Sequence, residues 1–240
     1  MNSILDKIAL VTGAGSGIGK AVSLKLAKEG VKVILLGRNI DKLNSVKREI
    51  TSFGGTSEIL PCDLLDDSLI FDVIDKAHNI FGGLDILINN AGMTLNCPLE
   101  STDIKDYDKI MAINSRAPYI LSKNALKYLR NSNHAVIVNV ASVVAHQGYP
   151  NQSAYTASKH ALLGWTKSLA NEVYKDGIRV HAISPGGVYT DMVAISRPDL
   201  SPEGMITASD VAESILFLIK NRTNAVIDEI QIHRSNKAPF

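Results

Sequence analysis

A serine, a tyrosine and a lysine in the second half of the chain have the types and the spacing of an acid catalyst and its supports. Tyr155 and Lys159 are four residues apart, so a helix over residues 151–170 would carry both side chains on one face, one turn apart. A phenol has an ordinary pKa of about 10, and a fixed ammonium beside it lowers that value. Ser142 follows an apolar run, where a strand end could place its hydroxyl beside the phenol. Together these groups could bind and protonate a carbonyl oxygen.

A second pair, Tyr119 and Lys123, has the same spacing. The residues before it, 114–118, form no strand that ends in an exposed serine, so we interpret this pair as two residues on a helix surface. Spacing alone does not select Tyr155 and Lys159, and the support for them has to come from the rest of the chain.

Length, composition and charge predict one α/β domain over residues 1–240. The chain has 45% hydrophobic residues and a formal net charge of +1, with no basic block that would suit nucleic acid. No apolar run approaches the ~18 residues of a membrane helix, and the polar start resembles no secretory signal. Cys62 and Cys97 fit neither a disulfide framework nor a metal motif. We therefore expect a cytoplasmic protein with no membrane span and no metal.

The first forty residues predict a dinucleotide site. An apolar run over residues 7–12 is followed by the glycine turn GAGSGIG, Gly13 to Gly19, then by an amphipathic run over 20–29 and a second apolar run over 31–36. Strand, glycine turn, helix and strand is the unit that holds a pyrophosphate at a helix N-terminus, because glycines let the backbone approach the phosphates. A tight turn that uses glycine only for its conformational freedom is the alternative.

The end of the second strand indicates the choice of cofactor. NAD sites carry an acidic residue near this position to bind the ribose 2′-hydroxyl, whereas this chain has Gly37 and Arg38. A guanidinium there could pair with a 2′-phosphate, so we expect NADP(H), with NAD(H) possible. The alternative is that Arg38 is a solvated loop cation.

Polar residues follow the next strands. Asp63, after a strand over 56–61, could accept a hydrogen bond from the adenine amine or could be the N-cap of a helix over 66–80. Residues 89–92, Asn-Asn-Ala-Gly, could tie strand ends together and leave space for a flat ligand. Asn114 lies inside a helical run over 102–130 that Pro118 could kink, freeing a carbonyl for water, although a surface asparagine fits the spacing equally.

The last third of the chain predicts a strand over 178–183, ended by Ser-Pro-Gly-Gly, a short lid over 191–207, a helix over 210–220 and an alternating strand over 225–233. Candidate pocket residues, each with an ordinary alternative as loop or core, are Leu95, Cys97, Val144, His146, Tyr149 and Met192.

With these elements in order, the chain resembles the short-chain dehydrogenase/reductase superfamily, in its single-domain NAD(P)-dependent branch. The family pattern Thr-Gly-x-x-x-Gly-x-Gly falls on residues 12–19, and its adenine and strand-stabilising elements fall on Asp63 and residues 89–92. Asn114, Ser142, Tyr155 and Lys159 match the catalytic tetrad. Pro185, Gly186 and Thr190 match the segment that holds the nicotinamide. The second pair, Tyr119 and Lys123, matches nothing in the family.

The resemblance implies a Rossmann fold: a doubly wound parallel seven-stranded sheet, ordered 3-2-1-4-5-6-7, with helices on both faces. It implies that Tyr155 is the general acid, that Ser142 binds the substrate oxygen, that Lys159 binds the ribose and lowers the Tyr155 pKa, and that Asn114 holds a water. It also implies a homotetramer or homodimer packed through 102–130 and 151–174. The implied cofactor-binding residues are Gly13, Ser16, Gly17, Ile18, Gly19, Arg38, Asp63, Asn90, Ala91, Gly92, Tyr155, Lys159, Pro185, Gly186, Val188 and Thr190.

The implied activity is NADP(H)-dependent transfer of a hydride between nicotinamide and a carbonyl or secondary alcohol. The likeness is greatest to 3-oxoacyl carrier-protein reductases and related carbonyl reductases, but the chain lacks their C-terminal Asp-Gly-Gly after Ile232 and has a short lid. Both differences argue against an acyl-carrier substrate. The expected substrate is a ketone or a 3-oxoacyl compound, and the candidate pocket residues suit an apolar or aromatic ketone, with a sugar or a quinone as alternatives. The alternatives are an NAD-dependent secondary alcohol dehydrogenase and a non-catalytic dinucleotide-sensing binding protein.

Overall fold

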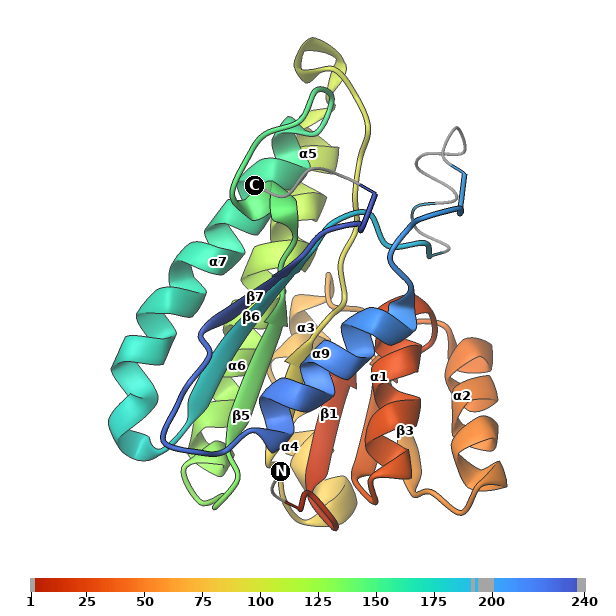
Figure 1. Ribbon diagram of the computed structural model, residues 1–240, viewed down its shortest axis with the longest axis vertical. Helices are drawn as coiled ribbons and strands as arrows, with labels where there is room; N and C mark the ends of the chain where they lie inside the picture. Colours follow the sequence, from red (N-terminus) through yellow and green to blue (C-terminus); the bar gives the residue numbers. More distant parts are fainter. Residues whose placement is uncertain (1–2, 191–192, 194–200, 237–240) are drawn as a thin grey trace.

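A parallel sheet of seven strands runs through the centre of the computed structural model, which describes residues 3–190, 193 and 201–236 (Figure 1). The spatial order is β3-β2-β1-β4-β5-β6-β7, and every neighbouring pair is parallel. This confirms the predicted class and strand order. The strands are β1 (Ile8–Thr12), β2 (Lys32–Gly37), β3 (Ser57–Pro61), β4 (Ile86–Asn89), β5 (Val136–Val140), β6 (Arg179–Pro185) and β7 (Glu229–Ile232).

Helices cover both faces of the sheet, which explains why the central strands are continuous apolar runs (Figure 1). In β1, Ala9 and Val11 pack against one helical layer, and Leu10 packs against the other. The first layer consists of α1 (Gly17–Lys28), α2 (Ile40–Ser52) and α9 (Ala208–Lys220). The second consists of α3 (Asp67–Ile70), α4 (Val73–Phe81), α6 (Ala117–Leu129) and α7 (Ser153–Val173), with α5 (Ile104–Met111) leading into α6.

The strand order reverses between β1 and β4, because β2 pairs with one edge of β1 and β4 with the other. In open α/β sheets a ligand binds beyond the carboxyl ends of the strands at such a switch point. The glycine turn follows β1, and Asn90 follows β4, so both lie at that crevice.

Three predicted elements differ from the structure. The helix expected over 66–80 is two helices, α3 and α4. The long helical run over 102–130 is α5, a π-helix (Ala112–Arg116) and α6, with Pro118 in the first turn of α6. The last strand is only β7, because backbone carbonyls before it accept side-chain donors: Arg179 bonds the carbonyl of Thr223, and His181 bonds that of Ile227 at 2.7 Å.

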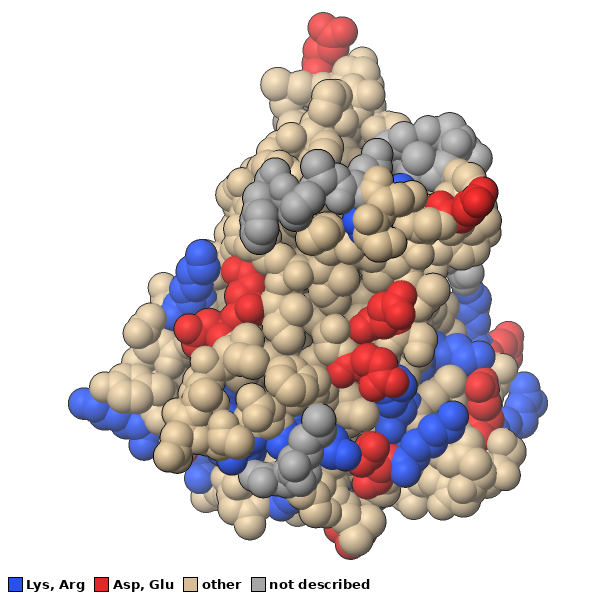
Figure 2. Space-filling model, in the orientation of Figure 1, with Lys and Arg blue, Asp and Glu red and all other residues tan. Residues whose placement is uncertain are grey.

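The surface carries charges of both signs. On the face shown in Figure 2, acidic and basic side chains are interspersed, with no block of one sign. Among the described residues no helix is both long enough and apolar enough to cross a bilayer.

Candidate active site

Ser142 lies two residues beyond the end of β5, and its hydroxyl is close enough to the Tyr155 phenol to lower the Tyr155 pKa by hydrogen bonding. The Ser142 hydroxyl also donates to the Pro185 carbonyl at 3.4 Å and accepts from the Val144 N–H at 3.3 Å. The backbone of Ser142 is extended and caps a short 3₁₀ turn, so the strand end fixes where this hydroxyl points. The sequence prediction that β5 delivers Ser142 to the phenol therefore agrees with the geometry.

The Tyr155 side chain is half-buried, and its pKa moves in the direction opposite to the one that the spacing predicts. Burial raises the pKa of Tyr155, and the hydrogen bond with Ser142 lowers it to a smaller extent. The expectation of a lowered pKa considered the charge of Lys159 alone. In the structure the cost of burying a phenolate is larger, so the neutral phenol is the favoured form.

Lys159 is 4% exposed, and its Nζ lies 5.9 Å from the centre of the Tyr155 ring. The ammonium donates to the Val140 carbonyl at 2.7 Å. Burial lowers the pKa of Lys159 from 10.5 to about 8. Near neutral pH this lysine therefore stays mostly charged, but it loses its proton more readily than an exposed lysine.

Asn114 lies in the π-helix and joins the loop after β4 to α7. Its Oδ1 accepts from the Met93 N–H, and its Nδ2 donates to the Met93 carbonyl, both at 2.8 Å. Nδ2 also donates to the Ser158 hydroxyl at 2.9 Å, and that hydroxyl donates to the Tyr155 carbonyl at 2.7 Å. Asn114 is 1% exposed, so the alternative of a surface asparagine is wrong.

The small residue Gly92 allows these groups to approach one another. A β-carbon at Gly92 would lie 3.1 Å from Asn114 Oδ1 and 3.8 Å from Lys159 Nζ. The four predicted catalytic residues thus belong to one connected cluster, in which Asn114 reaches Tyr155 through Ser158. That Asn114 leaves a carbonyl for a water stays a prediction.

Sequence reasoning missed two features of the structure, one inside this cluster and one outside it. Ser158 lies inside the Tyr-x-x-x-Lys motif, but nothing in the spacing marks it as a bridge. A buried polar network was also missed: the Asn89 amide donates to Asn139 at 2.8 Å and to Ser122 at 3.0 Å, and Asn139 donates to Thr166 at 2.8 Å. An asparagine inside the apolar run VIVNV was the available signal for this network.

The glycine turn after β1 has the shape of a phosphate cradle. Gly13 has φ of +66°, and a β-carbon on Gly19 would overlap the Gly13 carbonyl, so the first turn of α1 packs directly against the strand end. Ser16 is the N-cap of α1, and its side chain makes no capping hydrogen bond. Its hydroxyl and the first N–H groups of α1 suit a pyrophosphate. The Ile18 side chain packs into the core, so only its backbone can serve a cofactor.

The other predicted cofactor residues surround this cradle. The Asn90 amide donates to the Thr12 carbonyl, and the Thr12 hydroxyl accepts from the N–H groups of Asn90 and Ala91, all at 2.9 Å. These bonds tie β4 to β1, as the amides were expected to do. The Thr190 methyl would lie 3.2 Å from a β-carbon on Gly17, so the segment after β6 meets the glycine turn.

Arg38 and Asp63 face each other beyond β2 and β3. The Arg38 Nη1 lies 4.0 Å from Asp63 Oδ2, and both side chains are substantially exposed. Asp63 is not the N-cap of a helix, because Asp66 occupies that position and accepts from the Ser68 N–H at 2.8 Å. Asp63 instead accepts from the Leu65 N–H at 3.0 Å.

The candidate pocket residues have mixed outcomes. His146 is held by Glu229, with 2.6 Å between Nε2 and Oε1, which restricts its freedom as a second acid. Met192 and most of the predicted lid lie outside the described residues. At the end of that segment Ile206 forms a bridge with Val188, and the Tyr189 N–H donates to the Ile206 carbonyl at 2.9 Å. The described residues contain no group of three side chains that could hold a metal.

The chain is similar to known proteins over nearly its whole length. The sequence profile described as short chain dehydrogenase matches residues 7–201. An uncharacterized oxidoreductase of Staphylococcus aureus (strain MRSA252) is 32% identical over 232 residues, which is 97% of this chain and 99% of that protein.

Solved structures of short-chain oxidoreductases and dehydrogenases are also similar to this chain. A metagenomic short-chain oxidoreductase in complex with NADP has a TM-score of 0.86 and 30% identity, covering 98% of this chain and 100% of that one. A short chain dehydrogenase from Burkholderia cenocepacia J2315 in complex with NADP has a TM-score of 0.87 and 30% identity, covering 97% and 98%. With the observed fold, these similarities show that the chain belongs to the short-chain dehydrogenase/reductase family and is an NAD(P)-dependent oxidoreductase.

Proposed function

We propose that this enzyme is an NADP(H)-dependent carbonyl reductase that converts a ketone to a secondary alcohol: R–CO–R′ + NADPH + H⁺ → R–CHOH–R′ + NADP⁺. The observation that carries the proposal is the position of the Ser142 hydroxyl, which lies close to the Tyr155 phenol and next to the Pro185 carbonyl, at the same carboxyl edge of the sheet as the glycine turn. The 3-oxoacyl thioesters are included as candidate substrates.

The protonation state of Tyr155 supports the direction of reduction. Because burial raises the pKa of Tyr155, the phenol carries its proton at neutral pH, and a reductase needs a proton donor. Ser142 would hold the carbonyl oxygen beside that phenol. NADPH, when bound, supplies the hydride, so the side chains have to provide only position and one proton. Lys159 would bind the nicotinamide ribose and stabilise the phenolate that remains after proton transfer, and Asn114 would position the loop around it.

The cofactor would lie in the cradle formed by the glycine turn and the N-terminus of α1, with the segment Pro185 to Thr190 against the nicotinamide. We propose a preference for NADP(H), because Arg38 is exposed beside the expected ribose position and no acidic residue replaces Gly37. If Arg38→Asp left the ratio of kcat/KM for NADPH and NADH unchanged, this preference would have another origin. The same ratio in the oxidative direction tests the alternative of an NAD-dependent alcohol dehydrogenase.

The first experiment follows NADPH consumption with a panel of ketones, aldehydes, quinones and 3-oxoacyl thioesters. Native enzyme is compared with Tyr155→Phe and with Tyr119→Phe, a matched control from the second Tyr-x-x-x-Lys pair. Tyr119 is 54% exposed and packs edge-on against Trp165, so the control loses a hydroxyl far from the Ser142 cluster. We expect turnover that only Tyr155→Phe loses. Turnover retained by Tyr155→Phe would contradict the proton-donor role.

Tight NADPH binding without turnover of any substrate would favour a dinucleotide sensor. Such a protein would change its affinity for a partner when the cofactor binds, and Tyr155→Phe would leave that change intact. The presence of all four residues of the cluster supports the enzyme hypothesis instead, because a dinucleotide sensor does not need a side chain placed to donate a proton.

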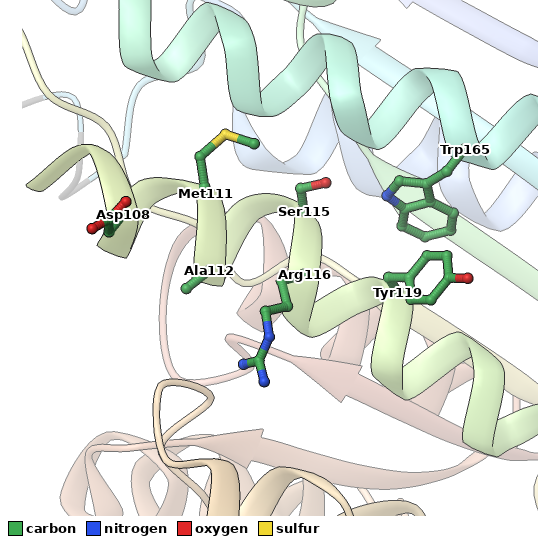
Figure 3. Close-up of a pocket in the computed structure, with 7 residues that line it drawn as sticks. All are labelled: Asp108, Met111, Ala112, Ser115, Arg116, Tyr119 and Trp165. Carbon is green, nitrogen blue, oxygen red and sulfur yellow. The ribbon is translucent and has the colours of Figure 1, made fainter. Parts of the chain in front are cut away.

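We propose that the enzyme assembles through α5, α6 and α7 into a homodimer or homotetramer. An apolar groove lies between the π-helix region and α7, lined by Met111, Ala112, Tyr119 and Trp165 (Figure 3). On the same side, Ile104 at the start of α5 is 70% exposed. Burying such side chains against a second copy would stabilise the assembly.

The mass in solution tests this assembly. Light scattering after size exclusion should give a dimer or tetramer for the native enzyme and for Tyr119→Phe, and a smaller species for Tyr119→Glu, which places a charge in the groove. An unchanged mass for Tyr119→Glu would contradict this interface. We also propose the cytoplasm as the compartment, since Cys62 and Cys97 are both free thiols.

A further inference from the structure

Strand β7 lies beside β6 at one edge of the sheet (Figure 1), and the residues that follow β7 place Arg234 next to Gly187, just beyond β6. β7 pairs with β6 with Ile232 opposite Pro185, and the Gly186 N–H donates to the Ile232 carbonyl at 2.7 Å. Continuing this register by two residues places Arg234 beside Gly187. A β-carbon on Gly187 would overlap the Arg234 guanidinium, whose Cζ lies 3.0 Å and whose Nε lies 3.1 Å from that position. The missing side chain of Gly187 makes room for this cation.

Arg234 has no charge partner in the part of the chain that the structure describes. Its half-buried side chain makes no hydrogen bond or ion pair with residues 3–190, 193 or 201–236. The carboxylate of Glu229, on the same strand, is occupied by His146 at 2.6 Å and by Ser184 at 2.5 Å. None of the described residues neutralises this partly buried guanidinium, and a ligand anion could do so.

The neighbouring residues hold the Arg234 stretch in place. Two residues further on, Asn236 packs against Gly204, and a β-carbon there would lie 3.3 Å from the Asn236 Cγ. The stretch from Arg234 to Asn236 therefore contacts the end of β6 on one side and residues before α9 on the other. A cation held in this way can select ligands by charge.

The segment after β6 shows which part of the site Arg234 faces. The carbonyl of Pro185, the last residue of β6, accepts a hydrogen bond from the Ser142 hydroxyl. Thr190, at the end of this segment, lies against the glycine turn that would hold phosphates. Gly187 is between them and only two residues from Pro185, a chain length of at most about 7 Å. Arg234 thus lies beside the segment that joins the groups that would bind the carbonyl to the expected pyrophosphate site.

We propose that Arg234 binds a carboxylate of the substrate, so that the enzyme prefers oxo acids whose ketone lies a few bonds from the carboxylate. This inference rests on the proposed carbonyl reductase function and narrows its substrate class. The planar guanidinium offers a carboxylate paired N–H donors. The ketone carbon gains the hydride of NADPH and its oxygen gains a proton, giving the hydroxy acid and NADP⁺. The carboxylate is unchanged and serves only for recognition.

The test compares straight-chain 2-, 3-, 4- and 5-oxo acids with their methyl esters, which have the same ketone without the charge. Native enzyme should prefer at least one acid to its ester. Arg234→Met, which keeps the length of the side chain, should lower kcat/KM for that acid by about 10- to 100-fold and leave the ester within about twofold. Arg234→Lys should retain part of the preference. Arg130→Met, which removes an exposed arginine paired with Asp176, is the control and should change neither.

Three results would overturn the inference: no preference of the native enzyme for any acid, an equal loss for acid and ester in Arg234→Met, or weaker NADPH binding in that variant. The second would show a packing role and the third a cofactor role.

A binding experiment separates this inference from the proposed function. If neither acids nor esters are turned over, 4-oxopentanoate and its methyl ester are titrated into NADP⁺-loaded Tyr155→Phe, with and without Arg234→Met. Tighter binding of the acid that depends on Arg234 would support the carboxylate site although the reductase proposal had failed. Equal binding of acid and ester would overturn it.

Discussion

Replacing Lys159 by methionine should separate stability from activity, with a signature that depends on pH. Lys159 is buried, and the structure lowers its pKa from the ordinary 10.5 to about 8. Because one pH unit corresponds to about 1.4 kcal/mol, the charged form of this side chain costs about 3 kcal/mol in the folded protein. Methionine has a similar length and carries no charge, so Lys159→Met removes this cost.

The loss of a hydrogen bond opposes that gain. The ammonium donates to the Val140 carbonyl at 2.7 Å, and a bond to a charged donor contributes roughly 1.5–3 kcal/mol. At about pH 7 the two effects nearly cancel, so the free energy of unfolding of Lys159→Met should differ from that of the native enzyme by no more than about 1–2 kcal/mol. Its turnover should nevertheless be lost, because no cation remains to stabilise the Tyr155 phenolate.

The pH dependence shows which effect is present. Between about pH 8 and 10.5 the unfolded chain keeps the Lys159 proton and the folded protein has released it. In this window the unfolded state binds more protons, so the native enzyme gains stability relative to Lys159→Met as the pH rises. The difference in unfolding free energy should increase by about 1.4 kcal/mol for each pH unit and approach about 3 kcal/mol.

Urea denaturation of both proteins from about pH 7 to about pH 9.5 measures this difference, since subtraction removes the titration of all shared groups. Lys28→Met is the control, because Lys28 is exposed at the end of α1 and its ammonium stays in water in both states. A difference that is as flat with pH as that of the control would refute the argument that burial opposes the charge of Lys159.

Three further predictions follow from the same structure. Asn114→Ala should lower the unfolding free energy by about 2–4 kcal/mol in urea, because it leaves the Met93 N–H and carbonyl without partners in a buried site. Gly19→Ala should abolish NADPH binding in a fluorescence titration, since its methyl would overlap the Gly13 carbonyl. Burial lowers the pKa of His181, so stability should fall as the pH drops below about 6.5, and His181→Leu should weaken that dependence in thermal melts.

The succession of strands and helices could be predicted because each strand and its following helix carry local signals, whereas the order of the strands in the sheet came from the family resemblance. Apolar runs, glycine turns and amphipathic stretches alternate along the chain, and burial on both faces of the sheet produces such runs. The boundaries that failed depend on contacts from distant residues. The strand expected over 225–233 has the right alternation. However, the Arg179 side chain donates a hydrogen bond to the Thr223 carbonyl just before this range, and the His181 side chain donates one to the Ile227 carbonyl in its first half. Hydrogen bonds of this kind leave no trace in local spacing.

The residues proposed for the site lie together in the structure, whereas their electrostatics was predicted only in part. Spacing placed Tyr155 and Lys159 on one face of a helix, and the observed α7 does so. The direction of the Tyr155 pKa was wrong, because desolvation depends on what the completed fold packs around the phenol. Arg234 was missed for a related reason: its place beside Gly187 depends on the register of β7 against β6, which local sequence does not specify.

One physical cause connects these observations. Burial raises the pKa of Tyr155 and lowers that of Lys159, so the neutral form of each group is more favoured than it would be in water. In that state the phenol holds the proton that a carbonyl oxygen requires. When the proton leaves, hydrogen bonding by Ser142 and the charge of Lys159, which burial disfavours, would stabilise the new phenolate. In the proposed reaction, interactions that favour the phenolate would therefore stabilise the transition state of proton transfer more than the resting enzyme, and this lowers the barrier.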